Sequence, residues 1–407
     1  MKALSALSAE VRQYLLVTGN YWAFTLTDGA LRMLVVLHFH TLGYTPLQIA
    51  ALFLFYEIFG VITNLVGGYL GARLGLNRTM NIGLGLQVLA LLMLTVPAAW
   101  LTIAWVMGAQ ALSGIAKDLN KMSAKSSIKL LVPDSQQGTL YKWVAILTGS
   151  KNALKGVGFF LGGALLALLG FTGAVLAMAA VLALIWLASL VLLKKDLGKA
   201  KTKPKFRDLL SKSRAINILS AARLFLFGAR DVWFVVALPV YLSSVLGWDF
   251  WWVGGFLAAW IIGYGMVQSL APHITGKQRG QVPDGRSACA WAALLASLPA
   301  AIALGLTVGG SPQLVLIGGL MLFGALFAVN SSLHSYLIVS YAKEDGVSLD
   351  VGFYYMSNAL GRLIGTLLSG WVYQHHGLEA CLWISTVFVL LAALISIALP
   401  KHAAATN

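Results

Sequence analysis

The chain has 407 residues, of which 59% are hydrophobic and only 11% are charged, and its formal net charge at pH 7 is +15. Apolar stretches of about 20 residues recur along its whole length, which excludes a soluble globular fold and predicts a polytopic α-helical membrane protein. In a soluble protein this charge would suggest binding to nucleic acid. Here the basic residues gather in alternate loops, so the bilayer is the expected partner and no nucleic-acid partner is predicted.

Twelve apolar segments are long enough to cross a bilayer as helices. In chain order they are 13–41, 46–71, 79–97, 101–130, 139–168, 172–193, 215–244, 250–272, 286–307, 313–341, 349–373 and 379–399. The sequence therefore predicts an all-α polytopic fold with twelve transmembrane helices in two six-helix halves. The halves are residues 1–193 and 215–407, and a basic cytosolic linker, 194–214, joins them.

The predicted loops differ in charge between the two sides of the membrane. Loops after odd-numbered spans contain no Lys or Arg, whereas loops after even-numbered spans carry Arg73, Arg78, Arg286 and the linker. Because positive residues stay on the cytoplasmic side, both termini are expected there. No apolar stretch precedes Tyr14, so no cleaved signal peptide is expected.

The halves also look related to each other. Asp28 lies fifteen residues before the turn at Gly43, and Asp231 lies sixteen residues before the turn at Gly247. Such weak internal symmetry is typical of transporters built from two six-helix halves.

Cysteine and carboxylate patterns argue against a metal centre. Cys289 and Cys381 lie in apolar segments far apart in the sequence, which supports neither a disulfide framework nor a Cys-rich metal site. A membrane-embedded enzyme would need an acidic metal-binding cluster or a catalytic His facing a nucleophile, and the sequence offers no compact set. A receptor would usually carry a long soluble domain. No enzyme activity, cofactor or metal is therefore predicted.

Charges inside the predicted spans are the main functional signal. One Lys, Arg or Asp at a helix centre costs roughly 2.5 to 3.5 kcal/mol, so several of them must face a wet cavity or one another. At 100° per residue, Lys117, Lys121 and Lys125 fall on one stripe of the fourth span, and Lys151 and Lys155 share a face of the fifth. Two helices are thus expected to present lysine ladders.

Internal pairing is the alternative role for these charges. Asp118 can reach Lys121 at i, i+3, and Asp28 can reach Arg32 at i, i+4. The eleven deepest charges comprise seven cations and four acids: Arg32, Lys117, Lys121, Lys151, Lys155, Arg230 and Arg362 against Asp28, Glu57, Asp118 and Asp231. Because cations remain in excess, an anionic substrate is predicted as their counter-ion.

The candidate site residues follow from these positions, with polar groups of the tenth span added. The predicted substrate-binding residues are Lys117, Lys121, Lys151, Lys155, Arg32, Arg230, Arg362, Asn330 and His334, and the proton-coupling candidates are Asp28, Glu57, Asp118 and Asp231. Arg223 and Lys125 lie nearer the cytosolic ends, where snorkelling is expected to relieve their charge.

Two short motifs resemble those of the major facilitator superfamily. GYLGARLGLNR, residues 68–78, resembles its loop after the second span, with Ala72 where an acid is usual. GVGFFLGG, residues 156–163, resembles its antiporter motif, with Phe159 where Pro is usual. The resemblance implies the two-half fold of that superfamily, with spans 1, 4, 7 and 10 lining the cavity.

Three longer segments resemble the ArsJ family of bacterial organoarsenical efflux permeases: LSAEVRQYLLVTGNYWAFTLTDGALRMLVV, GIAKDLNKMSAKSSIKLLVP and LTGSKNALKGVGFFLGG. This resemblance implies export of 1-arseno-3-phosphoglycerate, arsenate resistance and a place in the bacterial inner membrane. It also implies a functional link to the glyceraldehyde-3-phosphate dehydrogenase that makes this compound from arsenate. A permease for another phosphorylated or carboxylated metabolite is the alternative, because lysines recognise charge better than identity.

Overall fold

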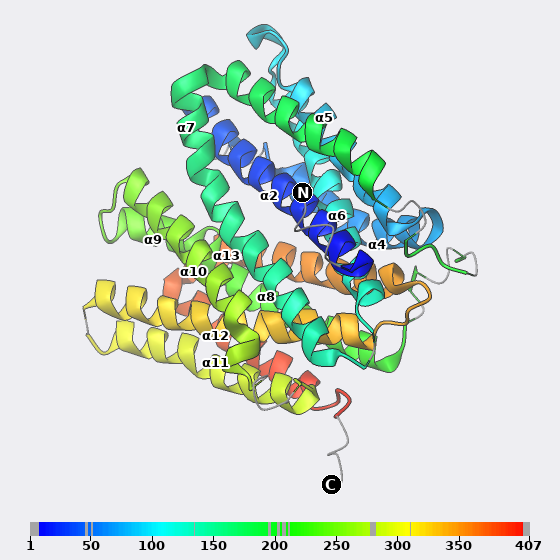
Figure 1. Ribbon diagram of the computed structural model, residues 1–407. Coiled ribbons are helices and arrows are strands. Elements are labelled where there is room, and N and C mark those ends of the chain that lie inside the picture. Colours follow the sequence, from blue (N-terminus) through cyan, green and yellow to red (C-terminus); the bar gives the residue numbers. More distant parts are fainter. Residues whose placement is uncertain are drawn as a thin grey trace. The chain divides into compact units, whose positions relative to one another are not determined.

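The regular elements of the chain are helices throughout the residues that its computed structural model describes (Figure 1). The described residues are 8–44, 48–49, 52–133, 135–193, 197–201, 204–205, 209–210, 212–276, 282–309 and 311–401. The helices are α2 (Ala9–Thr41), α4 (Leu54–Leu74), α5 (Leu76–Met93), the short 3₁₀ helix η1 (Ala98–Trp100), α6 (Ile103–Leu131), α7 (Gln137–Leu192), α8 (Arg214–Phe234), α9 (Ala237–Ser244), α10 (Phe250–Ile274), α11 (Gly285–Thr307), α12 (Pro312–Tyr341) and α13 (Val347–Ser396).

Two of these helices each contain two predicted spans. The backbone of α7 breaks at Gly170, with φ 68° and ψ 178°, and that of α13 breaks at Gly377, with φ 78° and ψ −177°. Because an L side chain is strained at such positive φ, glycine supplies the turn between two helices at both places. The predicted boundaries at 168–172 and 373–379 are confirmed, and so is the all-α fold.

Side-chain caps start several helices, and α10 begins at the predicted residue 250, whereas α2 begins at Ala9, four residues before the predicted start. The side chains of Ser8, Thr102 and Asp249 accept hydrogen bonds from backbone N–H groups in the first turns of α2, α6 and α10. Each cap satisfies a donor that the helix itself leaves open. Local sequence thus explains where these helices begin.

The boundaries of α4 and α5 differ from the prediction. Helix α4 begins at Leu54 and not at 46, and residues 45–47, 50 and 51 lie outside the described part. Helix α5 begins at Leu76, three residues earlier than predicted, and ends at Met93. Gly75, with φ 101°, is the single residue between the two helices. The sequence pattern missed this because glycine can reverse the chain without a polar loop.

Six helices among the described residues are long and apolar enough to cross a membrane: α7, α8 together with α9, α10, α11, α12 and α13. Helices α2, α4, α5 and α6 do not meet that measure. Helices α2 and α6 carry five of the eleven deepest charges, Asp28, Arg32, Lys117, Asp118 and Lys121, and these charges lower the mean hydropathy of the two helices. Charged residues with a predicted functional role thus explain why these two helices are less apolar than most of the others.

The chain forms two compact units, each described separately. Unit 1 comprises Met1–Leu140, Ser150–Ser211 and Ala342–Met356, and unit 2 comprises Tyr141–Gly149, Lys212–Tyr341 and Ser357–Asn407. In unit 1, α6 packs against α2, α4 and α5, and in unit 2, α12 packs against α8, α10 and α11. The division into halves at the basic linker remains a prediction.

Candidate functional site

Charged side chains from four helices meet inside unit 1, and we call this group the lysine cluster. Its members are Asp28 and Arg32 on α2, Tyr56 and Glu57 on α4, Lys117, Asp118 and Lys121 on α6, and Lys155 on α7. All of them except Tyr56 were predicted from the sequence to serve the substrate or a proton.

Two ion pairs of the lysine cluster bury the acid and leave the cation partly exposed. Lys155 Nζ lies 3.5 Å from Asp28 Oδ2, and the two side chains are 20% and 7% exposed. Lys121 Nζ lies 2.7 Å from Asp118 Oδ1, with exposures of 13% and 1%. The predicted pairing of Asp118 with Lys121 is confirmed. The surface that these pairs present to solvent is therefore positive.

The predicted pairing of Asp28 with Arg32 is wrong. Arg32 Nη2 lies 3.2 Å from Glu57 Oε1, so Arg32 turns toward α4 while Asp28 turns toward α7. The side chains of Arg32 and Glu57 are 30% and 34% exposed. Spacing along one helix shows which pairs are possible, but packing against neighbouring helices decides which of them form.

Tyr56 organises the middle of the lysine cluster. Its hydroxyl donates a hydrogen bond of 2.8 Å to Asp28 Oδ1. Lys117 Nζ lies 3.8 Å from the centroid of the Tyr56 ring, and Arg32 Cζ lies 5.0 Å from it. A cation over an aromatic face gains about 0.5 to 2 kcal/mol while its outer side stays available. Sequence reasoning missed Tyr56, although its position next to Glu57 places it on an inward-facing stretch.

Close helix packing explains why Lys155 meets Asp28. Gly158 and Gly162 of α7 face α2, and a Cβ atom built at Gly158 would lie 2.8 Å from the carbonyl oxygen of Leu26. A Cβ at Gly162 would collide with the carbonyl oxygen of Ala30. Small residues four apart let membrane helices approach closely. The glycine pair thus has a direct role in bringing the charged groups together.

We expect Gly162→Ala to separate α2 from α7, to weaken the Lys155–Asp28 ion pair and to lower the thermal stability of the protein. The matched control is Gly163→Ala on the next residue, because a Cβ there would meet only Leu37 Cδ1, at an ordinary 3.7 Å. Thermal unfolding of both variants in detergent checks this. Equal behaviour of the two variants would contradict the packing argument.

The first residues of α13, which belong to unit 1, add an aromatic ring beside the lysines. Lys121 Nζ and Lys125 Nζ lie 4.6 and 5.3 Å from the ring centroid of Tyr355. Lys125 is only 3% exposed, so the expectation that it snorkels is wrong. Lys151, which was predicted to share a helix face with Lys155, makes a local contact: its Nζ donates a hydrogen bond of 3.1 Å to Asn152 Oδ1.

Unit 2 contains a second charged group, the arginine cluster, made of Arg223, Arg230 and Asp231 on α8 and Arg362 on α13. Arg230 Nη2 lies 2.5 Å from Asp231 Oδ1, and Arg362 Nε lies 3.0 Å from Asp231 Oδ2. Asp231 is 0% exposed, whereas Arg230 and Arg362 keep 15% and 32% of their side chains exposed. One buried acid thus orients two arginines whose outer faces remain accessible.

Arg223 is a cluster member that sequence reasoning misplaced. It is 3% exposed and does not snorkel; its Nε donates to Asn358 Oδ1 at 2.8 Å and its Nη1 donates to Ser331 Oγ at 3.2 Å. The ring centroid of Phe227 lies 3.7 Å from Arg223 Cζ and 5.0 Å from Arg230 Cζ, so both arginines contact the same aromatic ring. The seven-residue spacing of the two arginines, which puts them on one helix face, was the available signal.

The predicted polar groups of α12 lie in different surroundings. Asn330 Nδ2 donates to the carbonyl oxygens of Trp291 and Leu326, at 2.9 and 3.0 Å, and so joins α12 to α11. His334 is fully buried, and neither of its ring nitrogens has a hydrogen-bond partner within the described part of the chain. A buried polar group without a partner costs free energy, so water or a ligand is the expected partner.

Sequence and fold comparisons agree on the family. The family model of the Major Facilitator Superfamily matches residues 15–344. Among curated proteins, no sequence matches the chain. The structure is similar to that of the human organic anion transporter MFSD10 (TETRAN), with a TM-score of 0.74 and 18% identity over 96% of this chain and 100% of that one.

Two other solved structures are similar in the same way. A bacterial homologue of the iron transporter ferroportin, in its outward-facing state, has a TM-score of 0.74 and 14% identity, covering 95% of this chain and 98% of that one. The E. coli fucose:proton symporter FucP has a TM-score of 0.74 and 12% identity, covering 96% and 99%. At such identities the likeness concerns the fold alone. Together with the family match over most of its length, it shows that the chain belongs to the Major Facilitator Superfamily and has the fold of its transporters.

Proposed function

We propose that the chain is a secondary active transporter that exports an organic oxyanion, and that this anion is 1-arseno-3-phosphoglycerate. The observation that carries the proposal is that Asp28, Asp118 and Asp231 are buried, while the cations paired with them keep exposed surface: Lys155, Lys121, Arg230 and Arg362. In helices that cross a membrane, a partly exposed cation needs water or an anion beside it, because lipid offers no counter-charge. An anionic substrate supplies that counter-charge.

The numbers of charges in each cluster fit a substrate with more than one negative charge. The lysine cluster has four cations, Arg32, Lys117, Lys121 and Lys155, and three acids, Asp28, Glu57 and Asp118. The arginine cluster has three cations and one acid, Asp231. Arginine binds oxyanions through two N–H groups at once, and lysine adds a compact charge, so the two types together suit phosphate-like groups.

The chemistry of arsenic separates the proposed substrate from trivalent arsenicals. A trivalent arsenic site would need several thiolates, and the chain has only two cysteines, Cys289 and Cys381. A pentavalent arseno group is a hard oxyanion like phosphate, and it prefers Lys, Arg and hydroxyl groups. The resemblance to ArsJ permeases supports the same substrate, together with a bacterial inner-membrane location, cytoplasmic termini and a link to a glyceraldehyde-3-phosphate dehydrogenase.

The candidates for proton coupling differ in how completely their oxygens are bonded. Asp28 accepts from Tyr56 and pairs with Lys155, and Asp231 binds two arginines. Asp118 pairs through Oδ1, while its buried Oδ2 has no hydrogen-bond partner among the described residues. An oxygen without a partner can accept a proton without breaking an existing bond. We therefore rank Asp118 above Asp28 and Asp231 as a candidate for proton coupling.

Uptake into everted membrane vesicles tests the proposal. The vesicles receive glyceraldehyde-3-phosphate, NAD and arsenate, with or without the dehydrogenase, and the arsenic that accumulates inside is measured with and without a pH gradient. We expect accumulation only when the enzyme is present. Accumulation of arsenate alone would contradict the organoarsenical substrate. Uptake of a phosphorylated metabolite in place of the arsenical would favour the alternative permease, whereas no uptake of any anion would reject the proposal.

A further inference from the structure

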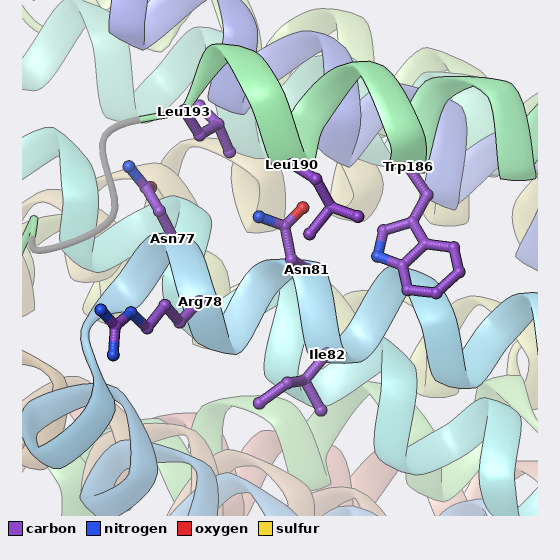
Figure 2. Close-up of a pocket in the computed structure, with 7 residues that line it drawn as sticks. All are labelled: Asn77, Arg78, Asn81, Ile82, Trp186, Leu190 and Leu193. Atoms are coloured by element: carbon purple, nitrogen blue, oxygen red, sulfur yellow. The ribbon is translucent and has the colours of Figure 1, made fainter.

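A groove between two helices of unit 1 lies outside both charged clusters (Figure 2). Its volume is about 470 Å³, and it lies between the first turns of α5 and the last turns of α7. Its walls include the aliphatic side chains of Ile82 and Leu190, each of which is 43% exposed. No acidic residue lines it within the described part of the chain. Both helices begin or end here, so the groove is at the level where they leave the membrane.

Two polar side chains that line the groove, Asn81 and Trp186, offer hydrogen-bond donors. Asn81 Oδ1 accepts a hydrogen bond of 2.6 Å from Ser189, whose own oxygen accepts one of 2.8 Å from Asn20. This network orients the amide, so that its nitrogen is left for the groove. Trp186 Nε1 is buried and has no hydrogen-bond partner in the described structure. Figure 2 shows this nitrogen on the side of the indole that faces Asn81.

Arg78 adds a positive charge at the outer end of the groove, beside Asn77 in the first turn of α5. The basic segment after α7 returns to the same place, because Leu76 N donates to Leu197 O and Ala200 N donates to Ala72 O, each at 2.8 Å. That segment continues with Lys199 and Lys201. The N-terminus of α5 contributes further positive potential. The charge at this end suits an anion.

The groups are ordered by depth along the two helices. Arg78 lies in the first turn of α5, and Ile82 lies about 6 Å further along the axis at 1.5 Å per residue. On the facing helix, Trp186 lies about 9 Å inside the end of α7 at Leu192. A guanidinium at the surface, amide and indole donors below it and aliphatic side chains beside them match the order of groups in a phospholipid.

We propose that this groove binds the headgroup of an anionic phospholipid, with the phosphate at Arg78 and Asn81 and an acyl chain along Ile82. The indole N–H of Trp186 donates to an ester carbonyl of the same lipid. The site is independent of the anion-export proposal, because none of its residues belongs to the lysine or arginine cluster.

Native mass spectrometry of the full chain tests this, after purification in detergent and addition of phosphatidylglycerol or phosphatidylcholine. We expect the wild type to retain phosphatidylglycerol preferentially. Arg78→Gln should lower that retention about fivefold, since one basic residue at a membrane surface contributes about 1 kcal/mol to binding an anionic lipid. The matched control is Arg286→Gln, which changes another exposed arginine in the first turn of a helix, α11, and should leave retention unchanged.

A second variant and a competitor complete the test. Trp186→Phe keeps the ring that packs over Gly85 but removes the N–H, and it should also lower retention of phosphatidylglycerol. Inorganic phosphate should not displace the lipid at millimolar concentration, because it lacks the acyl chain. Equal retention in Arg78→Gln and Arg286→Gln would overturn the proposal, as would displacement of the lipid by phosphate alone.

Discussion

The double variant Lys117→Gln/Lys121→Gln is expected to lose transport of the proposed anion almost completely while it still reaches the membrane. Each charge-assisted hydrogen bond contributes about 1.5 to 3 kcal/mol, so loss of two should reduce uptake by at least about a hundredfold. Lys117 lies over Tyr56 and Lys121 pairs with Asp118, so the substitution removes two cations from the middle of the lysine cluster. Arsenic uptake into everted vesicles measures the effect.

Two controls separate lost binding from lost folding. Lys142→Gln makes the same change at an exposed position in the first turns of α7 and should transport normally. Lys121→Gln leaves Asp118 without its cation, so Lys121→Gln/Asp118→Asn restores neutrality and should recover thermal stability but not transport. Normal uptake by the Lys117→Gln/Lys121→Gln variant would show that these lysines do not bind the substrate.

Asp231→Asn should produce the largest loss of stability of any single substitution in the arginine cluster. Asp231 is fully buried and pairs with both Arg230 and Arg362, so Asp231→Asn removes the carboxylate charge that both arginines contact. Removing one partner from a buried ion pair typically costs about 3 to 5 kcal/mol. Thermal unfolding in detergent is the measurement, with folded yield as a second readout.

Asp249→Asn is the matched control for this substitution. Asp249 caps α10 at an exposed position, and an asparagine side chain can cap the same N–H group. Asp231→Asn/Arg362→Gln should recover part of the lost stability, because one positive charge is then removed together with the negative charge. If Asp231→Asn unfolds no earlier than Asp249→Asn, the two ion pairs do not hold α8 and α13 together.

The two clusters contain the same kind of acid–cation pair between corresponding helices, which supports the internal symmetry predicted from the sequence. In unit 1 an acid on α2 meets a cation on α7, and in unit 2 an acid on α8 meets a cation on α13: Asp28 with Lys155, and Asp231 with Arg362. Glycines permit both contacts. A Cβ at Gly361, next to Arg362, would collide with the carbonyl oxygen of Leu224, as one at Gly162 would with Ala30. The acid and cation of each pair lie in corresponding spans of the two halves.

The sequence alone determined the fold class and predicted most of the charged residues that meet in the two clusters. Apolar length and charge are properties of a segment by itself, so they show which helices can enter a membrane and which side chains are costly there. The helix breaks at Gly170 and Gly377 could also be predicted, because each short turn contains a glycine between two apolar segments. The composition of each segment was therefore enough to predict these helices, charges and turns.

Only the tertiary structure decided which charges meet. Asp28 could reach Arg32 along its own helix, yet Tyr56 and Lys155 approach it from two other helices. Arg223 looked close enough to a helix end to reach water, yet the neighbouring helices bury it against Asn358. The physical reason is that an ion pair in a membrane depends on helix packing, and packing depends on where small residues from distant segments let two backbones touch.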